Sequence, residues 1–186
     1  MREFFTRRGD GGETGLLGDE RIAKSDLRLE VLGSIDEANS ALGMARSIAV
    51  REESRATLLK VQRDLYGLMS EIATTEKTAN AFPKVAAEQV EWLEAMIAQL
   101  TNSTSIPREF IVPGDTPSGA ALDVARTTVR RAERRCVALF QEDTQRNPEI
   151  LKYLNRLSSL CFVMELSENQ AASGKDSPTF AKQERS

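Results

Sequence analysis

Residues 126–135 read RTTVRRAERR, with five arginines and one glutamate in ten positions. On a helix successive residues turn by about 100°. The apolar residues of this region then fall into one stripe, made of Leu122, Ala125, Val129, Ala132, Cys136 and Phe140. Arg126, Arg130 and Glu133 follow one edge of the stripe, with Arg134 just beyond. The segment therefore predicts a helix that packs by one side and holds guanidinium groups at the margin of that contact.

The arginine side chains suggest a phosphate ligand. A guanidinium is always charged, and its planar fork fits two phosphate oxygens at once. One alternative is a solvated helix face with local Arg–Glu pairs. A second is RNA binding through Arg131 and Arg135, which point the opposite way, but the net charge of −3 argues against nucleic acid.

Length and composition indicate a single globular domain of 186 residues with 40% hydrophobic residues. We expect no membrane span, because no apolar run approaches about 18 residues. The first residues lack the apolar core of a signal peptide, so we expect a cytoplasmic protein. Cys136 and Cys161 fall on apolar stripes and are interpreted as reduced core residues, with a disulfide as the alternative.

The chain contains no histidine. The commonest general base and the commonest metal ligand are therefore missing. Any chemistry must depend on binding, on carboxylates, or on a reagent that needs no base.

Apolar periodicity predicts five helices and no strand. Their expected ranges are 34–50, 54–75, 84–101, 117–142 and 148–171. Ser34 and Glu37 fit a capping box for the first helix, and Thr116 with Pro117 fits the start of the fourth. Five long helices with short loops predict an all-α, up-and-down bundle.

We expect three regions along the chain: a Gly-rich amino-terminal loop (1–24), the helix bundle (25–171) and a polar, disordered tail (172–186). Residues 6–18 carry five glycines and could present backbone N–H groups to an anion. They lack the Gly-Lys-Ser/Thr ending of a Walker A loop. A flexible amino terminus is the alternative.

Three segments together resemble one protein family. They are TRRGDGGETGL (6–16), GSIDEANSALG (33–43), and the arginine helix with KYLNRLS (152–158). The combination is similar to the PduO-type ATP:cob(I)alamin adenosyltransferases over roughly residues 4–170. This resemblance implies the ferritin-like-style cobalamin adenosyltransferase bundle, assembled as a homotrimer with active sites between neighbouring subunits.

The resemblance implies an enzyme that moves the 5′-deoxyadenosyl group of ATP to Co(I) of cob(I)alamin. Triphosphate leaves, adenosylcobalamin forms, and Mg²⁺ assists. A reductase and an adenosylcobalamin-dependent acceptor enzyme are the implied partners, with no nucleic acid and no membrane. The alternative is a trimeric ATP-binding regulatory or cobalamin-chaperone module without turnover. Retention of Phe110 favours the enzyme.

The resemblance also implies site residues. The ATP contacts in the amino-terminal loop are Thr6, Arg7, Arg8, Gly9, Thr14, Gly15 and Lys24. Those on the fourth and fifth helices are Arg130, Arg131, Glu133, Arg134 and Asn155. Catalytic roles fall to Arg130, to an intersubunit Asp36–Arg126 salt bridge, and to Phe110. Phe110 resembles the aromatic that displaces the lower axial ligand of the corrinoid, although composition alone would place it in the core. No residue is assigned as a metal ligand.

The chain departs from the family pattern at four places. Asp115 stands where the family usually has glycine, Gly11 where a charged residue is usual, and Glu13 where a small or hydroxyl residue is usual. The fifth helix ends in ELSEN (165–169), where an Ala-Arg-Tyr-like sequence is more common. We expect these changes to alter affinity more than the reaction.

Overall fold

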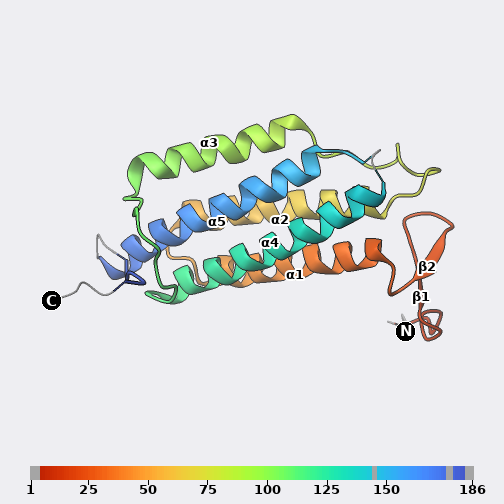
Figure 1. The fold of residues 1–186 in the computed structure, drawn as a ribbon, viewed down its shortest axis with the longest axis horizontal. Coiled ribbons are helices and arrows are strands. Elements are labelled where there is room, and N and C mark those ends of the chain that lie inside the picture. Colours follow the sequence, from red (N-terminus) through yellow and green to blue (C-terminus); the bar gives the residue numbers. More distant parts are fainter. Residues whose placement is uncertain (1–4, 144–145, 175–177, 183–186) are drawn as a thin grey trace.

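The computed structural model describes residues 5–143, 146–174 and 178–182 and consists of five long helices and a small β-hairpin (Figure 1). The helices are α1 (Leu27–Ile48), α2 (Glu52–Ala73), α3 (Ala87–Ser103), α4 (Pro117–Glu142) and α5 (Glu149–Ser173). Strand β1 (Glu13–Gly15) pairs antiparallel with β2 (Arg21–Ala23). The predicted five-helix bundle is confirmed. The prediction of no strand was wrong, because three-residue strands are too short to show alternation.

Helix α4 lies between α1 and α5. It packs against α1 and α5, while α1 also packs on α2, and α5 on α3. In Figure 1 the hairpin lies at the end of the bundle where α1 begins, and the loop between α3 and α4 lies at the opposite end. The hairpin region is joined to α2 through a parallel bridge between Leu17 and Thr74.

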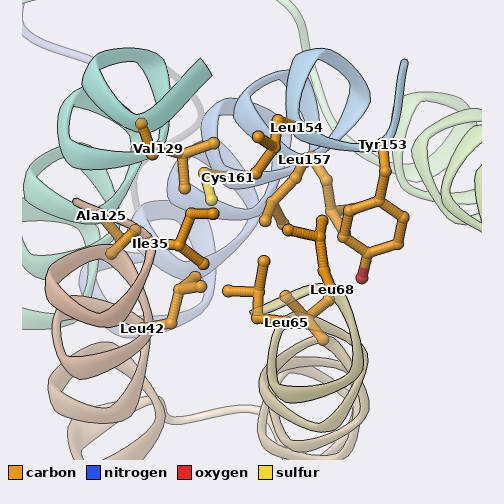
Figure 2. Packing of buried hydrophobic residues seen from close by; sticks show 14 of the residues in the cluster. Ile35, Leu42, Leu65, Leu68, Ala125, Val129, Tyr153, Leu154, Leu157 and Cys161 are labelled. Carbon is orange, nitrogen blue, oxygen red and sulfur yellow. The ribbon is translucent and has the colours of Figure 1, made fainter. Parts of the chain in front are cut away.

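Figure 2 shows the apolar stripes of four helices meeting in one core. Its labelled side chains are Ile35, Leu42, Leu65, Leu68, Ala125, Val129, Tyr153, Leu154, Leu157 and Cys161. Cys136 and Cys161 are buried free thiols, as predicted. Burial raises the pKa of each to about 12, which keeps both protonated near neutral pH. None of the helices in the described ranges combines the length and the apolar character that a bilayer crossing requires.

Helix α1 begins one to two turns earlier than predicted. Its N-cap is Asp26, whose carboxylate accepts the Arg28 N–H at 2.8 Å. The predicted cap, Ser34, is buried within the helix and donates its hydroxyl to the Glu30 carbonyl at 2.7 Å. A serine can return a hydrogen bond to the preceding turn. The Ser34–Glu37 capping box was therefore a false signal.

The start of α4 is as predicted and is fixed by close contact with α5. The Thr116 hydroxyl accepts the Gly119 N–H at 3.0 Å and donates to the Asn169 side-chain oxygen at 2.7 Å. A Cβ at position 119 would collide with the Asn169 side chain, so only glycine lets the two helices approach this closely. These contacts fix where α4 begins and where the preceding loop ends.

Part of the segment that follows α5 contacts the loop between α3 and α4. Helix α5 runs to Ser173, and Phe180 forms an antiparallel bridge with Ile111 in the loop between α3 and α4. Residues 178–182, part of the segment predicted to be a polar, disordered tail, thus lie beside this loop. The predictions for 1–4, 175–177 and 183–186 lie outside the described residues.

Candidate active site

A pocket of about 520 Å³ lies between α4, α5 and the loop that precedes α4. The loop contributes Arg108, Glu109, Phe110, Ile111 and Pro113. The helices contribute Asp123, Arg126, Arg130, Ser158, Ser159, Phe162 and Val163. Three of the predicted site residues, Phe110, Arg126 and Arg130, thus line one cavity although up to 20 residues separate them in sequence.

Phe110 is not a core residue. Its side chain is 89% exposed, the highest fraction among the exposed large hydrophobic residues. An aromatic ring left this open at a pocket is available to a ligand, and leaving it in water has a cost that ligand binding would remove.

The two arginines that α4 contributes to the pocket differ in their surroundings. Arg126 is 29% exposed, and its guanidinium contacts the Asp123 carboxylate one turn earlier, at 2.7 Å. Arg130 is exposed and has no hydrogen bond or ion pair in the described part of the chain. Of these two side chains, Arg130 is therefore the guanidinium that is free to take an anionic ligand.

A second acidic group, Glu165, lies near the Asp123–Arg126 ion pair. Glu165 on α5 is wholly buried, and neither of its carboxylate oxygens has a hydrogen-bond partner within the described ranges. Burial raises the pKa of Glu165 to about 7, with a further rise from Asp123 that Arg126 opposes. In the sequence, Glu165 is distinguished only as part of the segment 165–169 that departs from the family pattern.

Farther along α4 the structure brings together two more predicted residues. The Asn155 amide of α5 donates to the Glu133 carboxylate at 2.9 Å. Arg131 forms an ion pair with Glu37 of α1, so it is held across the α1–α4 contact. Arg134 is exposed.

The predicted loop residues form a separate cluster at the amino terminus. The Lys24 ammonium donates to the Gly9 carbonyl at 2.7 Å, which ties the start of the loop to the end of β2. Arg7 has a positive φ of 59°, in the left-handed region, and the Arg8 carbonyl accepts the Arg21 guanidinium at 2.7 Å. The Thr6 hydroxyl accepts the Arg8 N–H at 3.4 Å. Thr14 and Gly15 belong to β1.

The amino-terminal cluster and the pocket are far apart in one chain. Arg126 lies about 16 residues before the end of α4, which corresponds to roughly 24 Å of helix. The hairpin lies at that far end of the bundle (Figure 1). Among the described residues, no hydrogen bond or ion pair joins the loop of residues 5–24 to α4 or α5. One copy therefore does not bring the two halves of the predicted site together.

These features define a helix-bundle protein with a Gly-rich amino-terminal loop and a pocket that combines an open aromatic ring with an unpaired arginine. The family model described as cobalamin adenosyltransferase matches residues 4–168. The chain belongs to the cobalamin adenosyltransferase family.

Relatives and solved structures agree with this assignment. The chain is 36% identical over 165 residues to a corrinoid adenosyltransferase of Citrobacter freundii, covering 88% of this chain and 93% of that protein. It is 38% identical over 177 residues to a cobalamin adenosyltransferase of Cupriavidus metallidurans, covering 95% and 93%. A variant PduO-type ATP:corrinoid adenosyltransferase from Lactobacillus reuteri, complexed with cobalamin and ATP, superposes with a TM-score of 0.87 at 29% identity, covering 97% of this chain and 100% of that one.

Proposed function

We propose that this protein transfers the 5′-deoxyadenosyl group of ATP to Co(I) of cob(I)alamin and releases triphosphate. The observation that carries the proposal is the pocket in which the open Phe110 ring faces the same cavity as Arg126 and Arg130. Such a cavity offers an aromatic surface to a flat ligand and a cationic margin to a phosphate chain.

The reaction suits the residues present. The Co(I) electron pair attacks C5′ of ATP, a Co–C bond forms, and the C5′–O bond breaks with its electrons leaving on triphosphate. No proton is removed from the attacking atom, so the absence of histidine is no obstacle. The protein must orient the two substrates and stabilise the charge on the leaving group.

Each cluster has a role in this scheme. The amino-terminal loop supplies Lys24 and backbone N–H groups to ATP, and Arg130 grips phosphate oxygens with its fork. Glu133 and Asn155, which contact each other, lie along the same α4–α5 surface for the nucleoside end. Phe110 lies on the lower face of the corrinoid and takes the space of its lower axial ligand.

Mg²⁺ would act on the nucleotide rather than in a protein cage. The described residues contain no group of three or more acidic or cysteine side chains arranged to hold a metal. Mg²⁺ commonly keeps several waters and binds substrate phosphates through few protein ligands. The residues present fit that mode, in which the ion neutralises charge on triphosphate.

A homotrimer with sites between subunits accounts for the separation of the two clusters, because a neighbouring copy can supply the missing half. Asp36 is exposed, and no ion pair engages it in the described part of the chain. It is available to reach Arg126 of a neighbour, in competition with Asp123. Exposed apolar side chains on α1 and α4, Met44, Ile48 and Val124, also suit a subunit contact.

The wider context follows from the reaction. A reductase must deliver Co(I), an adenosylcobalamin-dependent enzyme must accept the product, and we place the protein in the cytoplasm. The competing function is an ATP-binding regulatory or chaperone module of the same fold. Such a module would bind nucleotide or corrinoid without making a cobalt–carbon bond.

The deciding experiment is an anaerobic incubation with ATP and chemically reduced cob(I)alamin, followed by absorbance. Formation of the light-sensitive Co–C product, with stoichiometric triphosphate, is the expected result. ATP binding with no product over many equivalents of substrate would favour the regulatory module instead.

A further inference from the structure

The short segment that follows α5 lies against the loop that carries Phe110. The Val112 N–H donates to the Thr179 carbonyl at 2.8 Å, and the Ala181 N–H donates to the Phe110 carbonyl at 2.8 Å. These two bonds flank the antiparallel Ile111–Phe180 bridge. The segment therefore pairs with the loop in the manner of a short β-strand, which is a known way to hold an extended chain.

A side-chain clamp reinforces the pairing. Asp115 accepts the Thr179 N–H at 2.9 Å with one carboxylate oxygen and the Thr179 hydroxyl at 2.6 Å with the other. Charge-assisted hydrogen bonds of this kind are stronger than neutral ones. Asp115 directly precedes Thr116, the N-cap of α4, so the clamp links the tail to the start of the helix that bears Arg126.

The loop has little else to fix its position. Within the described ranges, residues 105–114 make two backbone hydrogen bonds, and in both of them the partner belongs to the segment after α5. The Phe110 side chain is 89% exposed and so gains little from packing. A backbone without such partners samples many conformations, and ordering it costs conformational entropy.

We propose that residues 179–181, together with Asp115, are positioning residues that hold the Phe110 loop in place over the pocket. The inference rests on the proposed function, because it assigns the strand a part in presenting Phe110 to the corrinoid. It also explains one departure from the family pattern, since Asp115 replaces the glycine usual in the family and its carboxylate binds the tail.

The test removes one backbone donor from the full-length chain. Ala181→Pro deletes the N–H that bonds the Phe110 carbonyl and keeps an extended backbone. Lys182→Pro is the matched control, because in an extended strand the N–H of residue 182 points away from the strand partner of 181. Thr179→Val, which removes only the hydroxyl on Asp115, is a second variant of nearly unchanged shape.

Three readouts separate positioning from general stability. Hydrogen exchange of the Val112 amide reports whether the strand is formed. The absorption spectrum of bound Co(II) corrinoid with ATP reports how much cobalt has lost its lower ligand. Steady-state kinetics report kcat and the KM for ATP.

Loss of one hydrogen bond corresponds to about a two- to tenfold change in an equilibrium. We expect Ala181→Pro to lower the hydrogen-exchange protection of Val112 and kcat by about that factor. The same variant should reduce the fraction of bound cobalt that has lost its lower ligand. We also expect an unchanged KM for ATP, because the substitutions alter neither Arg130 nor the amino-terminal loop. Thr179→Val should act in the same direction, and Lys182→Pro should behave as the unmodified protein.

Unchanged Val112 protection in both test variants would overturn the strand itself. Lowered protection with unaltered kcat and cobalt spectrum would overturn its positioning role. An unmodified protein that makes no product would contradict the proposed function, and Val112 exchange would then still decide whether the strand exists.

Discussion

Glu165 predicts an unusual dependence of stability on pH. Its carboxyl group is wholly buried without a hydrogen bond in the described structure. By contrast Glu168, one turn later on the same helix, accepts the backbone N–H groups of Val50 and Arg51 at 2.7 and 3.1 Å. Burial, with Asp123 on α4 and Asp115 in the loop, outweighs the opposing effect of Arg126 and raises the pKa of Glu165 from 4.5 to about 7.

The direction in which stability changes with pH follows from proton binding to the folded and the unfolded chain. Below pH 4.5 the carboxyl group is neutral in both the folded and the unfolded chain, so it imposes no charge penalty. Between pH 4.5 and 7 the unfolded chain ionises first, and the free energy of unfolding falls as pH rises. At about 1.4 kcal/mol per pKa unit, the total loss is about 3 kcal/mol above pH 7.

The assay is urea unfolding of the unmodified protein and Glu165→Gln at pH 5, 6, 7 and 8, at one protein concentration because assembly adds to apparent stability. Glutamine cannot ionise, so the variant should gain about 2.5 kcal/mol relative to the unmodified protein between pH 5 and pH 8, because part of the loss has already occurred at pH 5. Glu91→Gln on the exposed surface of α3 controls for the loss of a carboxylate. Two parallel stability curves for the unmodified protein and Glu165→Gln would refute the reasoning.

Three further predictions concern the site. Arg130→Lys should lower kcat/KM by about 30- to 1000-fold, since one oriented donor is worth about 2–4 kcal/mol in the transition state. The melting temperature of this variant, and the kcat/KM of the exposed control Arg135→Lys, should stay close to those of the unmodified protein, and equal losses of kcat/KM in both variants would contradict a specific role. In sedimentation, Asp36→Arg and Arg126→Asp should each weaken the proposed trimer, and the double exchange should restore part of the lost assembly. An unmodified protein that sediments as a monomer at micromolar concentration would exclude the intersubunit pair. Hydrogen exchange in residues 6–24 should slow when ATP is added, because phosphate contacts order a Gly-rich segment, and equal protection with and without ATP would argue against this loop as the nucleotide site.

Regular periodicity made most of the fold predictable. The stripe through Leu122, Val129 and Cys136 is buried as expected, because spacing of three and four residues places side chains on one face of a helix. The start of α4 was equally predictable from the sequence, since Thr116 and Pro117 act through bonds within a single turn.

Features that depend on contacts distant in sequence could not be predicted. Thr179 and Asp115 are 64 residues apart, and nothing local indicates that they meet. Phe162 lines the pocket, but it lies beside the buried stripe of α5 and carries no motif of its own. The Asp123–Arg126 ion pair could have been predicted from the sequence, because side chains three residues apart on a helix are neighbours.

The central claim, adenosyl transfer at sites shared between copies of the chain, is tested most directly by subunit complementation. Lys24→Ala impairs the amino-terminal loop, Arg130→Lys impairs the pocket, and each variant alone should be nearly inactive. The two chains are unfolded together, refolded as mixed trimers, and assayed anaerobically with ATP and cob(I)alamin. If each site joins the loop of one copy to the pocket of its neighbour, random assembly restores both intact halves in about a quarter of the sites, and activity should return to about that level. Mixed trimers that stay as inactive as the separate variants would contradict the shared site.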